Sequence, residues 1–151
     1  MAEPLLTRDG RTVMSGIRKR AVEGPVKVDL LGLHGDQQAD PKVHGGYAKA
    51  VYAYPHEHYP FWQTVRAQTG AAGWGEVLAP GALGENLTLT GVSEHDVWVG
   101  DLLRFPGCTL AVSQPRYPCF KLEIKMGDPL FPRRFLASGR TGFYLRVLEE
   151  G

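Results

Sequence analysis

The chain has 151 residues, of which 43% are hydrophobic and 22% charged, and its formal net charge at pH 7 is +1. This composition is typical of a soluble globular protein and excludes a disordered chain, and the length suits one domain with its own hydrophobic core. The near-neutral charge gives no general attraction to nucleic acids or membranes, so neither is expected as a partner.

Two cysteines exclude a disulfide framework, and by themselves they exclude an iron–sulfur cluster, which usually takes four thiolates. The N-terminus has no basic segment followed by an apolar one, so we expect no signal peptide. No apolar stretch approaches the roughly twenty residues of a membrane helix. We therefore expect a cytoplasmic protein.

In the N-terminal half, branched residues predict strands over 12–20 and 26–33, and an alternating pattern predicts another over 49–54. Residues 56–68 are expected to form the main helix, with a break or late start near Pro60. The stretch "GAAGWG" that follows is read as a loop.

In the C-terminal half, short strands with turns between them are predicted over residues 86–91, 101–107 and 108–114. A short helix is expected next, with Asp128 as N-cap and Pro129 as first residue, ending at Gly139. Residues 142–149 are predicted to be the final strand.

Strands dominate these predictions, so we expect a mainly β (α+β) fold. Its natural architecture is a closed or nearly closed barrel with a few peripheral helices. Glycines and prolines are spread along the whole chain without a linker, so we expect residues 1–151 to form a single domain.

The most distinctive segment is "SQPRYPCFKLE", residues 113–123, which places Arg116 and Lys121 near Cys119. Nearby cations lower the pKa of a thiol, so Cys119 is a candidate reactive or metal-binding thiolate. The alternative is a small buried hydrophobic residue. The two prolines predict a stiff exposed loop and no regular element. Cys108 opens an apolar segment and is expected to be a buried thiol without a disulfide partner.

Two segments combine glycines with polar residues. Residues 35–46 contain His44, Gly45 and Gly46 beside two aspartates, which is typical of either a polar-ligand site or a hydrated turn. Residues 80–91 contain "GENL", whose backbone N–H groups could face an anion or a heterocycle edge. The alternative is a glycine-rich connection.

The segment "SGIRKR" carries Arg18, Lys19 and Arg20, which indicates either a phosphate-binding strand or a solvated strand end. In a strand, the two arginines would share one face. His56 and His58 are two residues apart and would point to different faces of a helix, so we expect surface histidines and no metal site.

Taken in order, "SGIRKR", "GLHGDQQADPKVHGGYAKAVYAYPHEHYPFW", "GALGENLTLTG", "VGDLLRF" and "SQPRYPCFKL" resemble the MOSC domain, named for the C-terminal domain of molybdenum cofactor sulfurase. "GRTGFYLRVL" resembles a bacterial branch that reduces N-hydroxylated bases and related compounds. The resemblance covers about residues 12–149, without the helical extension that this branch carries beyond the barrel.

The resemblance implies a strand-rich barrel that binds molybdenum through a single molybdopterin, with Cys119 as the protein ligand to the metal. It implies no flavin or iron–sulfur site in this chain and no dependence on pyridoxal phosphate. The residues implied to bind the cofactor are Arg18, Lys19, His44, Gly45, Gly46, Gly84, Glu85, Asn86, Gln114, Arg116 and Lys121.

The activity implied is reduction of a small N-hydroxylated substrate, such as an N-hydroxylated purine or an amidoxime. Cys119 would hold the metal, and His44 is the candidate proton donor because a histidine titrates near neutral pH. Electrons would come from an external reductase. Two alternatives remain: a carrier of the cofactor or of sulfur that uses Cys119, and a simple binding domain for an anionic small molecule.

Overall fold

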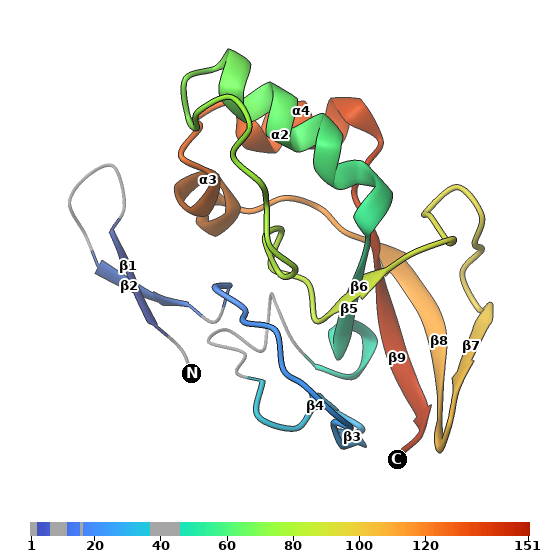
Figure 1. The fold of residues 1–151 in the computed structure, drawn as a ribbon. Helices are drawn as coiled ribbons and strands as arrows, with labels where there is room; N and C mark the ends of the chain where they lie inside the picture. The colour runs from blue at the N-terminus through green and yellow to red at the C-terminus, as the bar shows by residue number, and fades with distance from the viewer. Residues whose placement is uncertain (1–2, 7–11, 16, 37–45) are drawn as a thin grey trace.

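The computed structural model describes residues 3–6, 12–15, 17–36 and 46–151. Its central element is a curled five-stranded sheet, half of a barrel, with strand order β6-β5-β9-β8-β7 (Figure 1). The strands are β5 (Val51–Pro55), β6 (Leu87–Leu89), β7 (Leu102–Phe105), β8 (Cys108–Pro115) and β9 (Phe143–Glu149). Strand β6 pairs parallel to β5, and the other neighbours are antiparallel. The expected mainly β, barrel-type fold is confirmed.

Two small hairpins precede the sheet, β1 (Glu3–Leu6) with β2 (Thr12–Ser15) and β3 (Val28–Asp29) with β4 (Gly32–Leu33). The strand predicted over 12–20 is therefore confirmed at β2 and wrong for residues 17–20, which have no regular structure. The single strand predicted over 26–33 is also wrong. There the chain turns back on itself, because the Asp29 carboxylate accepts the backbone N–H of Leu31 (3.0 Å).

Three α-helices lie together at one end of the sheet in Figure 1: α2 (Tyr59–Gln68), α3 (Phe120–Met126) and α4 (Phe131–Ser138). Two 3₁₀ turns, η1 (Tyr47–Lys49) and η2 (His56–His58), flank β5. The late helix start near Pro60 is confirmed, and so is the stop at Gly139, which has φ +67°. The predicted cap is wrong: the Asp128 carboxylate accepts the N–H of Leu130 (2.9 Å) in the turn before α4.

The core has two parts. Aromatic side chains fill the space between the helices and the sheet, and Trp62 donates its indole N–H to the hydroxyl of Tyr54 (2.5 Å). Aliphatic side chains fill the curl of the sheet, and Phe143 of β9 is buried there. Because β9 lies between β5 and β8, it contributes to both parts. None of the helices in the described ranges is long and apolar enough to cross a membrane.

Candidate functional site

The loop over residues 81–86, just before β6, is built around the buried carboxylate of Glu85. This carboxylate accepts the backbone N–H groups of Gly81 (3.1 Å) and Leu83 (2.9 Å), as well as hydroxyl donors from Tyr59 and Thr88. Four donors satisfy most of its acceptor capacity. Glu85 therefore fixes the loop conformation, and the two N–H groups it binds are not available to a ligand.

Two glycines let another segment lie directly against this loop. Gly81 and Gly84 both have φ near +85° (+89° and +84°), which L side chains rarely adopt. A Cβ at Gly81 would lie 3.0 Å from the Cβ of Lys19, and a Cβ at Gly84 would lie 2.8 Å from Cγ1 of Ile17. Because Gly81 and Gly84 have no side chains, residues 17–20 can pack directly against the loop.

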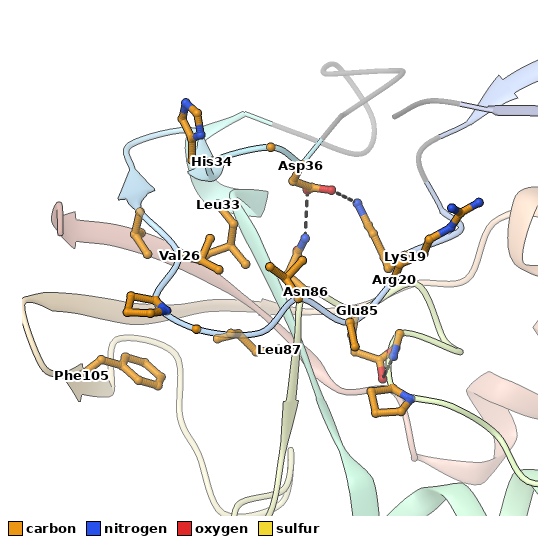
Figure 2. A pocket seen from close by; sticks show the side chains of 18 of the residues that line it. Lys19, Arg20, Val26, Leu33, His34, Asp36, Glu85, Asn86, Leu87 and Phe105 are labelled. Carbon is orange, nitrogen blue, oxygen red and sulfur yellow. Dashed lines mark hydrogen bonds and ion pairs between the residues drawn. The ribbon is translucent and has the colours of Figure 1, made fainter.

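Asn86 connects the loop to β5 and to Asp36. Its backbone N–H donates to the carbonyl of Tyr52 (2.8 Å), and its side-chain oxygen accepts the N–H of the same residue (2.8 Å). Its amide nitrogen donates to Asp36 (2.9 Å), whose other oxygen is bound by Lys19, as Figure 2 shows. Asn86 and Lys19, two of the predicted cofactor-binding residues, therefore lie close together and share the Asp36 carboxylate.

Arg116 is buried directly behind the loop, with only 4% of its surface exposed. Its Nη1 donates to the carbonyl of Leu83 (2.6 Å), and its guanidinium carbon lies 4.5 Å from the ring centre of Tyr52. Its Nε is enclosed and has no hydrogen-bond partner. Within the described part of the chain, no carboxylate forms an ion pair with Arg116. A buried cation without a counter-ion is costly, so this position favours an anion nearby.

Cys119 occupies the N-cap position of α3, where its carbonyl accepts the N–H of Leu122 (3.1 Å). It is half-buried against the aromatic core and is not part of a disulfide. Burial lowers the pKa of Arg116, but nearby Tyr52, Tyr144 and Cys119 raise it more, so the guanidinium stays charged. The electrostatic effect of Cys119 on Arg116 shows that the thiol and the guanidinium lie close together.

The prediction of an exposed, irregular loop over 113–123 is wrong. Strand β8 continues to Pro115, and α3 begins at Phe120. Arg116 and Lys121 are both buried, at 4% and 7% exposure. For Arg116 the reason is that its guanidinium points into the protein, where it contacts the loop and the ring of Tyr52. The juxtaposition of Arg116 and Cys119 that the sequence suggested is nonetheless present.

Lys125 is a site residue that the sequence analysis missed. Its ammonium donates to the carbonyl of Gly81 (2.5 Å). Burial is the largest cause that lowers its pKa to about 8; the positive charges of Arg116, Lys19 and Arg18 add to this effect, and Glu85 opposes it. The sequence signal that could have found it is the spacing of Lys121 and Lys125. Residues four apart lie on one face of a helix, so a helix predicted after Cys119 would have placed both lysines together.

A cavity of about 770 Å³ lies on the other part of the loop (Figure 2). Its polar wall includes Arg18, Lys19, Arg20, Asp36, Glu85 and Asn86, and its apolar wall includes Val26, Val28, Leu33, Leu87, Phe105 and Leu110. Neither Cys119 nor Arg116 lines it. Leu83 and Gly84 contact Arg116, whereas Gly81 lines the cavity, so one loop connects the thiol region with the cavity.

The remaining predicted site residues lie as follows. Gln114 is half-buried on β8 opposite Tyr144, next to a register shift in the pairing with β9. Gly46 has φ +82° and begins the η1 turn. His44 and Gly45 lie outside the described residues. Among the described residues, no three His, Cys, Asp or Glu side chains are grouped as a metal site.

Predictions for the other thiol and the histidines have different outcomes. Cys108 is buried in the curl of the sheet at 8% exposure, as predicted. His56 is exposed, also as predicted. The prediction is wrong for His58, because its imidazole is largely buried and lies 2.6 Å from the Glu94 carboxylate. Glu94 in turn accepts the N–H of Gly142 (3.0 Å), so the pair connects η2 to the start of β9.

Comparison with known proteins identifies the family. The model of the MOSC domain matches residues 40–151, about three quarters of the chain. The chain therefore belongs to the MOSC domain family. The solved structure of YiiM from Geobacillus stearothermophilus superimposes with a TM-score of 0.74 at 37% identity, covering 100% of this chain and 66% of that one.

Two curated relatives support the same assignment. YflK from Bacillus subtilis is 42% identical over 146 residues, which is 97% of this chain and 62% of YflK. A protein named Reductase from Gibberella moniliformis is 37% identical over 143 residues, which is 94% of this chain and 24% of that protein. The chain thus spans about three fifths of its bacterial relative and a quarter of the fungal one.

Proposed function

We propose that this protein binds a molybdenum–molybdopterin cofactor with Cys119 as the metal ligand and reduces small N-hydroxylated molecules. The observation that carries the proposal is the pairing of Cys119 with Arg116, a buried guanidinium that lacks a counter-ion among the described residues. A soft thiolate beside a fixed positive charge suits a soft metal held by an anionic pterin phosphate.

The residues present fit such a cofactor. Arg18, Lys19, Arg116 and Lys125 place positive charge around one loop, as the anionic phosphate end requires. Cys119 is half-buried as a residue, which is compatible with a thiol that binds a ligand and is partly shielded from water. Glu85 and the two loop glycines would act indirectly, by holding the loop in position.

The cofactor, when bound, would supply the two-electron chemistry that cleaves an N–O bond. The overall reaction takes up two electrons and two protons, and it yields the amine or amidine and water. Arg116 would keep Cys119 ionised, and the cations would orient the cofactor by its phosphate. His44 is the proposed proton donor on the strength of its sequence position.

The proposed substrates are N-hydroxylated purines and amidoximes. A fungal relative is named Reductase, which supports the reaction class but not a substrate. The chain has only two cysteines, too few for an iron–sulfur cluster, and we identify no flavin site in its sequence. We therefore propose that a separate reductase supplies the electrons and that the protein acts in the cytoplasm.

The test is metal and pterin analysis of protein made in a host that synthesises the cofactor. We expect molybdenum in the wild-type protein and in Cys108→Ala, the matched thiol control, and its loss in Cys119→Ser. Turnover of an amidoxime with a chemical reductant should follow the same pattern. Full molybdenum content in Cys119→Ser would overturn the assignment of the ligand. Molybdenum without turnover would instead support a cofactor carrier.

A further inference from the structure

Two cations donate to the carbonyl groups of a single loop. The ammonium of Lys125 binds the carbonyl of Gly81 (2.5 Å), and Nη1 of Arg116 binds that of Leu83 (2.6 Å). Glu85 occupies the N–H groups of the same two loop residues. The loop is therefore held between one carboxylate and two cations, and both cations come from the segment that follows β8.

Both cations keep hydrogen-bonding capacity. An ammonium has three donors, and the bond to Gly81 uses one of those of Lys125. Arg116 has five donors, and its Nε has no partner. Within the described ranges, no carboxylate lies close enough to either residue to form an ion pair. The loop carbonyls thus position these cations without neutralising them.

The charges that face Lys125 come from three elements. Glu85 belongs to the loop, Arg116 follows β8, and Arg18 and Lys19 belong to the 17–20 segment. Lys19 is itself paired with Asp36. Among the described residues, the cluster contains more cations than carboxylates, an imbalance that a dianion would reduce. Burial first, and then the three neighbouring cations, lower the pKa of Lys125 to about 8 against the opposing effect of Glu85.

We propose that Lys125 is part of the site that binds the ligand's phosphate group, and that Lys125 takes up a proton when a phosphate dianion binds. The inference rests on the proposed function, because the same cations are proposed to hold the cofactor's phosphate. It adds a residue and a proton linkage to that function.

The direction of the linkage follows from the charges. A dianion beside Lys125 favours the ammonium and raises its pKa above the value in the free protein. At a pH between the two pKa values, the free protein has lost the proton and the complex holds it. Binding therefore takes up a proton, and the uptake is greatest midway between the pKa of about 8 in the free protein and the higher pKa in the complex.

The experiment is calorimetric titration of the full chain with inorganic phosphate, in two buffers of different ionisation enthalpy. Phosphate is mostly dianionic at pH 8 and almost entirely so at pH 9, so its own titration contributes least at pH 9. From a free-protein pKa of about 8, we expect proton uptake at both pH values, and more at pH 9 than at pH 8.

Variants separate a role in binding from a role in holding the loop. Lys125→Arg keeps a permanent charge, so it should bind phosphate with almost no proton uptake. Lys125→Met should bind roughly ten- to a hundredfold more weakly at pH 8, the loss expected for a charge-assisted hydrogen bond. Lys27→Met, at an exposed lysine, should match the wild type.

Undiminished uptake in Lys125→Arg, absence of uptake in the wild type at pH 9, or absence of phosphate binding would each overturn the inference. A purely structural role for Lys125 would lower the melting temperature of Lys125→Met but leave proton uptake in Lys125→Arg unchanged. The outcome is independent of the redox proposal. Proton-linked phosphate binding by a protein that holds no molybdenum would support the inference and count against the proposed function. Molybdenum-dependent turnover without proton uptake on phosphate binding would support the proposed function and count against the inference.

Discussion

Replacement of Gly84 by alanine tests whether the loop needs close contact with the 17–20 segment. Gly84 has φ +84°, and the conformation costs an alanine roughly 1–2 kcal/mol. The new Cβ would also lie 2.8 Å from Cγ1 of Ile17, an overpacking that typically costs about 1–3 kcal/mol. We therefore expect Gly84→Ala to lower the free energy of unfolding by about 2–5 kcal/mol.

The matched control is Gly91→Ala. Gly91 has nearly the same φ, +82°, but a Cβ there would meet nothing within 4 Å. It should lose only the conformational part, about 1–2 kcal/mol. Urea unfolding of both variants isolates the contact as the difference between them. If Gly84→Ala were as stable as Gly91→Ala, the packing argument would be refuted.

A double variant examines the same contact from its other side. Ile17→Ala removes Cγ1, so the added methyl at position 84 should cost less in that background. The coupling free energy expected for side chains in direct contact is about 0.5–3 kcal/mol. A coupling near zero would mean that the loop relaxes away from Ile17 without cost. The Cβ would also lie 3.6 Å from Nη1 of Arg116, so the hydrogen bond to Leu83 is a second reporter of any shift.

Three further predictions concern the thiols, the cations and the last strand. In cofactor-free protein, iodoacetamide should modify Cys119 before Cys108, because Cys119 is half-buried beside a cation whereas Cys108 is only 8% exposed. Mass spectrometry of the alkylated peptides measures the order of modification. The reverse order would contradict the assignment of Cys119 as the reactive thiol. Lys19→Ala should lower cofactor occupancy at a nearly unchanged melting temperature. Arg116→Ala should lower both, since its guanidinium is buried and bonded to the loop; full occupancy in both variants would place the phosphate elsewhere. Deletion of 141–151 should abolish cooperative unfolding, since β9 joins β5 to β8; an unchanged transition would refute this role.

Most strands could be predicted from the sequence because their apolar residues are bounded by clear turn signals. Strands β6 to β9 and β5 lie where branched and aromatic residues alternate between glycines and prolines. The hairpin at residues 28–33 could not be predicted as two strands, since "VKVDLLGL" is rich in branched apolar residues and has no proline or Asn-Gly-type turn signal between its two halves. The turn depends on the Asp29 carboxylate and leaves Leu30 and Leu31 exposed at 45% and 55%.

Helix α3 was missed for a tertiary reason. Its seven residues contain two lysines and a glutamate, and two prolines precede them, so local signals favour a loop. In the folded chain, Leu122 and Met126 are buried against the aromatic core, four residues apart on one face. Packing against residues distant in sequence stabilises this helix, and no local propensity reports such packing.

The site shows a similar division. The sequence motifs predict that Gly84, Glu85, Asn86 and Arg116 all belong to the site. They do not indicate which of these residues would contact a ligand and which would hold the loop. In the structure, the carboxylate of Glu85 and the amide of Asn86 bind protein atoms, and the backbone of Gly84 lies against Ile17, so all three residues hold the loop in position. Arg116 is different, because it is buried and, among the described residues, forms no ion pair and has no hydrogen-bond partner for its Nε.

This difference predicts different consequences for the two kinds of residue. A buried polar group whose hydrogen bonds are all formed stabilises the fold. Its removal leaves its partners buried without a hydrogen bond, because no water reaches them, and the protein loses stability. A buried cation without a counter-ion lowers stability until an anion arrives, and the free energy it costs in the empty protein is recovered on binding. The proposed anion-binding role of Arg116 and Lys125 therefore rests on hydrogen-bonding capacity and charge that the described residues leave unsatisfied, whereas the sequence motif indicates only that these cations lie near Cys119.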